Sequence, residues 1–95
     1  MGRRLLVTDD SMMIRELIKE LALESGWQIV GEAANGDEAI ELFKQYQPDV
    51  TTLDLVMPVH DGLHALRGIR AIDPQAKVLV ISAISQTEVL REALS

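Results

Sequence analysis

Short apolar runs alternate with amphipathic stretches along this chain. Each run has the length of a buried strand, and the intervening apolar residues recur at the i, i+3, i+4 and i+7 positions of one helical face, as Ile14, Leu17, Ile18 and Leu21 do. The predicted strands are 4–8, 27–32, 50–54 and 77–82. Three helices are predicted between them, and a fourth begins near Thr87.

Capping and turn residues mark the predicted boundaries. Ser11 is a suitable N-cap for the first helix, and Gly26 is suited to end it. The pairs Asn35-Gly36 and Asp61-Gly62 are typical of turns before the second and third helices. Capping and turn residues therefore separate the predicted strands and helices.

This pattern favours an α/β fold with a doubly wound parallel sheet. Strands that are apolar along their whole length are typical of sheets covered by helices on both faces. We expect residues 1–95 to form one domain, because the chain is too short for two cores. A strand order of 2-1-3-4 would place the first and third strands side by side.

Composition narrows the function further. The chain has no cysteine, which excludes disulfides, zinc–thiolate sites and a cysteine nucleophile. Its net charge of −6 and the lack of a basic stripe argue against nucleic-acid binding. No apolar run approaches the ~20 residues needed to cross a bilayer. We therefore expect a cytoplasmic protein that does not contact the membrane.

Three acidic residues follow predicted strands. Asp9 and Asp10 come after the first strand, and Asp54 ends the third. Because the carboxyl ends of neighbouring parallel strands meet at one edge, the three carboxylates could share a cation. Oxygen ligands alone favour Mg²⁺, or Mn²⁺, over Zn²⁺. The alternative is that the acid pair merely caps a helix and forms a turn.

A bound metal would give these residues a chemical use. It could hold a phosphoryl oxygen while a carboxylate attacks phosphorus and forms an acyl phosphate. Ser82, at the end of the fourth predicted strand, lies on the same edge and could donate its hydroxyl to the phosphoryl group.

Three motifs resemble those of the receiver domain of bacterial response regulators. They are Val7-Thr8-Asp9-Asp10-Ser11, Asp54-Leu55-Val56-Met57-Pro58 with Asp61-Gly62, and Ile81-Ser82-Ala83. The resemblance implies a flavodoxin-like fold and a two-component phosphorelay in which Asp54 accepts phosphate from a sensor histidine kinase. It implies Mg²⁺ binding by Asp10 and Asp54, by Asp9 largely through a water, and by the backbone carbonyl of Val56.

The resemblance also implies how the phosphorylated domain would pass on its signal. Ser82 would be the switch hydroxyl, and the chain is most similar to stand-alone chemotaxis regulators, whose downstream partner is the flagellar motor switch. Such a domain catalyses only its own phosphorylation and dephosphorylation and is not a turnover enzyme. Val56 also stands where aspartyl phosphatases carry a general acid, which disfavours that class.

The sequence departs from the receiver pattern at its C-terminal end. Receivers continue with a fifth strand, which carries a Lys followed by Pro, and with a fifth helix, and nothing in residues 1–95 matches them. We therefore expect an incomplete domain whose fourth strand is an apolar edge open to self-association. An alternative function is a truncated or degenerate receiver that acts as an interaction or dimerisation module without phospho-signalling.

Overall fold

A four-stranded parallel sheet forms the centre of the molecule. The computed structural model describes residues 2–54, 61–81 and 94. Its strands are β1 (Arg4–Thr8), β2 (Gln28–Ala33), β3 (Val50–Leu53) and β4 (Val78–Val80). Their order is β2-β1-β3-β4, which confirms the predicted doubly wound sheet and its strand order.

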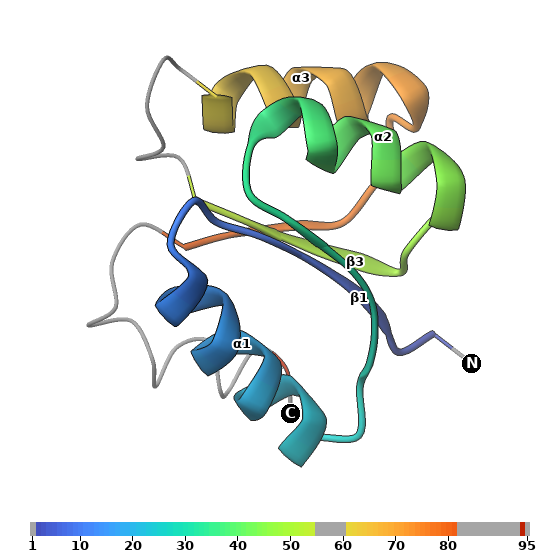
Figure 1. The fold of residues 1–95 in the computed structure, drawn as a ribbon. Coiled ribbons are helices and arrows are strands. Elements are labelled where there is room, and N and C mark those ends of the chain that lie inside the picture. Colours follow the sequence, from blue (N-terminus) through green and yellow to red (C-terminus); the bar gives the residue numbers. More distant parts are fainter. Residues whose placement is uncertain (1, 55–60, 82–93, 95) are drawn as a thin grey trace.

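Helices cover both faces of this sheet (Figure 1). Helix α1 (Met12–Glu24) lies on one face, and α2 (Gly36–Tyr46) and α3 (Asp61–Ile72) lie side by side on the other. Side chains of β1 point alternately to the two faces of the sheet, so the strand contributes to the packing of both helical layers. Leu5 and Val7 pack with α1, whereas Leu6 packs with residues of α2 and α3.

The ends of α1 follow from the predicted residues. Ser11 is the N-cap, and its Oγ accepts a hydrogen bond from the N–H of Ile14 at 3.3 Å. At the other end Gly26 has a φ of +84°, and the N–H groups of Gly26 and Trp27 donate to the carbonyls of Leu23 and Ala22. This is a Schellman motif, which favours glycine because of the positive φ.

The two predicted turns lie where the second and third helices begin. Asn35 is the N-cap of α2, where its Oδ1 accepts from the N–H of Glu38 at 2.8 Å. Asp61 and Gly62 form the first turn of α3. Asparagine, aspartate and glycine suit turns and helix starts alike, so the residue types alone did not separate the two.

Strand ends also differ slightly from the prediction. Strand β2 runs one residue later than expected, β3 ends one residue before Asp54, and β4 is limited to three residues. The fourth helix expected near Thr87 lies outside the described residues. Within the described part of the sheet, β4 is a terminal strand and Val80 is 40% exposed.

Candidate functional site

The acidic site forms where β1 and β3 end together. Thr8 pairs with Leu53 in the parallel register, so the residues that follow them, Asp9 and Asp54, leave the sheet side by side. One carboxylate oxygen from each of Asp9, Asp10 and Asp54 lies within 4.8 Å of the others. The structure thus confirms the predicted meeting of these three side chains.

Asp9 is the most enclosed of the three acids. It is 4% exposed, whereas Asp54 is half-buried and Asp10 is exposed. The N–H of Asp9 donates to the carbonyl of Ala33 at 3.1 Å, and its Oδ1 accepts from the N–H of Ser11 at 2.9 Å. The main chain and the carboxylate of Asp9 are therefore both held in place.

The electrostatics of the cluster disfavour three free charges. The pKa of the Asp9 carboxyl is raised from 3.8 to about 6, mainly by burial and also by the nearby carboxylates of Asp54 and Asp10, against the lowering effect of the Ser11 hydrogen bond. Without a counterion, Asp9 therefore holds its proton to unusually high pH. A cation among the three carboxylates would remove this repulsion.

The donor set fits a hard divalent cation. It offers carboxylate oxygens from two adjacent residues and from a neighbouring strand end, with no histidine or cysteine in the group. Mg²⁺ and Mn²⁺ prefer such oxygen ligands, and Mg²⁺ is commonly held by one or two carboxylates and substrate phosphate oxygens. Asp9, Asp10 and Asp54 are thus the residues that would hold a metal here.

Two predicted site residues, Val56 and Ser82, lie outside the described residues. The chain after β4 reaches the end of the sheet where the acidic site lies. The N–H of Ile81 donates to the carbonyl of Leu53, the residue before Asp54, at 2.9 Å. Lys77 directly precedes β4 and therefore lies at the opposite end of the parallel strands from the acidic site.

A group of charged residues that the sequence motifs did not indicate lies beside the site. Arg15 donates from Nη1 to the backbone carbonyl of Asp9 at 2.7 Å and from Nε to Glu32 at 3.0 Å. Lys19 also binds Glu32, at 2.9 Å. The only sequence signal is that Arg15 and Lys19 are one helical turn apart, on the same face.

Comparison with known proteins agrees with this geometry. The profile of the response regulator receiver domain matches residues 5–95. The chain belongs to the response regulator receiver domain family. Among its receiver relatives is the chemotaxis protein CheY of Thermotoga maritima, which is 40% identical over 94 residues, covering 99% of this chain and 78% of that protein.

Further receivers show the same relationship. The chemotaxis protein CheY of Bacillus subtilis is 38% identical over 94 residues, covering 99% of this chain and 78% of that protein. A CheX–CheY–BeF₃–Mg²⁺ complex from Borrelia burgdorferi contains a chain that matches with a TM-score of 0.80 at 29% identity, covering 97% of this chain and 72% of that one. The flavodoxin-like receiver fold expected from the motifs is thus confirmed.

The length and apolar character of the helices indicate whether any of them could span a membrane. In the described ranges of the receiver, no helix combines the length and the apolar character that spanning a bilayer requires.

Proposed function

We propose that this receiver is a phosphorylatable signalling switch in which Asp54 accepts a phosphoryl group with the help of Mg²⁺. The observation that carries the proposal is the meeting of the Asp9, Asp10 and Asp54 carboxylates within 4.8 Å at the edge where β1 and β3 end. A divalent cation held by these carboxylates would offset their repulsion.

Each residue has a separate task in this proposal. An oxygen of Asp54 attacks phosphorus and forms a P–O bond, while the bond from phosphorus to the donor breaks and the donor leaves with its electron pair. Asp9 and Asp10 supply the negative charge that binds the cation. When bound, Mg²⁺ supplies charge neutralisation at the phosphoryl oxygens. Ser82 would donate its hydroxyl to the transferred group, and Val56 would offer its carbonyl to the metal.

The donor in this proposal is a sensor histidine kinase. Transfer from a phosphohistidine breaks a P–N bond, and the imidazole leaving group takes up a proton. The similarity to chemotaxis proteins supports a role in chemotaxis. In this proposal the protein is cytoplasmic and its downstream partner belongs to the flagellar motor switch. The chain turns over no external substrate in this role, because the phosphoryl group that it accepts stays on its own carboxylate until hydrolysis.

Intact-mass spectrometry tests the proposal. The full chain is incubated with phosphoramidate, a small donor with a P–N bond, in the presence of Mg²⁺ or of a chelator. We expect the wild type to gain the mass of one phosphoryl group with Mg²⁺ only. Asp54→Asn should gain nothing.

The matched control is Asp73→Asn, because Asp73 is an exposed aspartate whose Oδ1 accepts a hydrogen bond from the N–H two residues later, as Asp9 does. This variant should be phosphorylated like the wild type. No mass gain in the wild type, or an equal gain in Asp54→Asn, would contradict the proposal. An absence of mass gain in the wild type would instead favour an interaction module that does not use phosphate.

A further inference from the structure

Arg15 connects the first helix to both the acidic cluster and β2. Its Nη1 donates to the backbone carbonyl oxygen of Asp9 at 2.7 Å, and its Nε donates to Oε1 of Glu32 at 3.0 Å. Only 14% of the Arg15 side chain is exposed. A planar guanidinium that donates in two directions while largely buried has little freedom to reorient.

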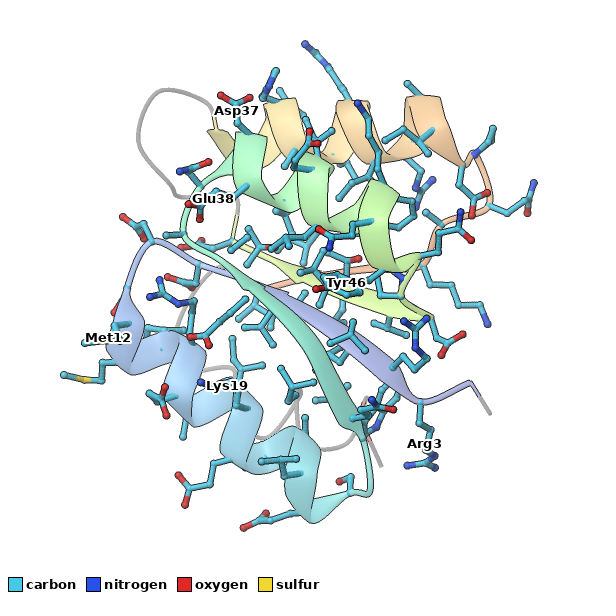
Figure 2. All side chains as sticks on the ribbon, turned by 45° about the vertical axis from the view of Figure 1, so that its right-hand side comes forward. Arg3, Met12, Lys19, Asp37, Glu38 and Tyr46 are labelled. Carbon is cyan, nitrogen blue, oxygen red and sulfur yellow. The ribbon has the colours of Figure 1, made fainter. Side chains whose placement is uncertain are left out.

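Glu32 is itself fixed by a second cation. Lys19 donates from Nζ to Oε2 of Glu32 at 2.9 Å and to Glu16 at 2.7 Å. Figure 2 shows Lys19 on the side of α1 that faces the sheet, in keeping with this contact. The hydrogen bond from Lys19, followed by that from Arg15, lowers the pKa of the Glu32 carboxyl below its usual range. Glu32 is therefore a charged anchor at neutral pH.

These contacts hold the main chain of Asp9 from two sides. Its N–H donates to the carbonyl of Ala33, the residue after Glu32, and its carbonyl accepts from Arg15. Both polar main-chain atoms of Asp9 are thus tied to the end of β2, one directly and one through Arg15 and Glu32. The carboxylates of Asp9 and Asp10 project from this fixed segment.

We propose that Arg15, anchored by Glu32, is a positioning residue that sets the placement of Asp9 and Asp10 for a divalent cation. The inference rests on the proposed function, since it concerns the same acidic cluster. Arg15 contacts the carbonyl of Asp9, so it acts through the main chain. Mg²⁺ requires near-ideal octahedral geometry, which makes its binding sensitive to ligand placement.

Geometry and charge make opposite predictions for Arg15. If only its charge mattered, removing a cation beside the cluster would strengthen the attraction for Mg²⁺. If its hydrogen bonds position Asp9, removing them weakens Mg²⁺ binding. Residues that orient metal ligands typically contribute about 10–100-fold in affinity. The sign of the change therefore separates the two roles.

The experiment measures Mg²⁺ binding to the unphosphorylated full chain by isothermal titration calorimetry. Arg15→Gln should raise the Mg²⁺ dissociation constant about 10-fold. Lys19→Gln is the matched control, because it also removes a cation from Glu32, whereas Lys19 donates to Glu32 and Glu16 and Arg15 donates to Asp9. It should bind Mg²⁺ nearly as the wild type does. Arg15→Lys keeps the charge without the planar fork and should fall between the two.

A second readout needs no metal. Exchange of the Asp9 amide hydrogen, measured by NMR with a chelator present, should be faster in Arg15→Gln than in the wild type and unchanged in Lys19→Gln. If Arg15→Gln does not fold, Glu32→Gln replaces it, and the readout is then the metal-free exchange of the Asp9 amide, which should again be faster than in the wild type because Arg15 has lost its anchor. Unchanged or tighter Mg²⁺ binding together with an equally protected Asp9 amide would overturn the inference.

Failure of the proposed function would look different. In that case the wild type would bind Mg²⁺ no better than Asp54→Asn, whereas the exchange of the Asp9 amide would still report whether Arg15 holds this segment.

Discussion

Replacing Asp9 with asparagine tests whether the acidic cluster lowers the stability of the metal-free protein. The change is nearly isosteric, and the asparagine Oδ1 can still accept the hydrogen bond from Ser11. The substitution removes the negative charge of Asp9, a residue that is 4% exposed and lies beside two other carboxylates. We expect Asp9→Asn to raise the free energy of unfolding at pH 8 when no metal is present.

The magnitude follows from the pKa of Asp9. Its value rises from 3.8 to about 6 on folding, so between these pH values the folded state binds more protons than the unfolded state. The free energy of unfolding therefore falls as pH rises through this range and stays low above it. At about 1.4 kcal/mol per pKa unit, the loss is up to about 3 kcal/mol. Asp9→Asn should recover about 1–3 kcal/mol, or a melting temperature roughly 5–15 °C higher.

Urea unfolding at pH 4 and pH 8, with a chelator or with Mg²⁺, measures this effect. The gain should be present at pH 8 with the chelator and small at pH 4, where the wild-type carboxyl is protonated. Mg²⁺ should stabilise the wild type more than the variant and narrow the gap. Asp73→Asn, which alters an exposed aspartate with the same local hydrogen bond outside the acidic cluster, should show no such gain. A metal-free variant that is no more stable than the wild type at pH 8 would refute the reasoning.

Two further predictions concern packing. Gly68→Ala should lower the free energy of unfolding by about 1 kcal/mol in urea unfolding, because the new Cβ would lie 2.4 Å from Cδ1 and 2.8 Å from Cγ1 of Ile40, where α2 and α3 meet. Adding Ile40→Val, which removes Cδ1 but keeps Cγ1, should restore part of this loss. Thr51→Val should raise the unfolding free energy by about 1 kcal/mol, because the Thr51 hydroxyl is buried without a hydrogen-bond partner. An unchanged urea midpoint in Gly68→Ala or a lower one in Thr51→Val would contradict these expectations.

The fold was predictable because local pattern and topology agree. The four apolar runs and the helical face of α1 predicted the alternation of strands and helices, and an order of 2-1-3-4, which is common among doubly wound sheets, places β1 beside β3. The meeting of Asp9 and Asp54 follows from that adjacency alone. Boundaries were less predictable where one residue type serves two purposes, as Asn35 does when it caps α2.

Other features had no local signal. Arg15 and Glu32 lie on different elements, and a polar residue on an amphipathic helix is usually read as solvated. The close approach at Gly68 depends on how α3 meets α2, which the periodicity of either helix does not specify. The burial of the Thr51 hydroxyl without a hydrogen-bond partner was likewise not predictable, because threonine is favoured in strands whether or not its hydroxyl is hydrogen-bonded.

Locating the acceptor residue tests the central claim most directly. The chain is treated with phosphoramidate and Mg²⁺, reduced with borohydride, which converts an aspartyl phosphate to homoserine, and sequenced by tandem mass spectrometry. We expect homoserine at position 54 only when donor and Mg²⁺ are both present. Homoserine at Asp9 or Asp10 instead of Asp54, or no homoserine at all, would contradict it.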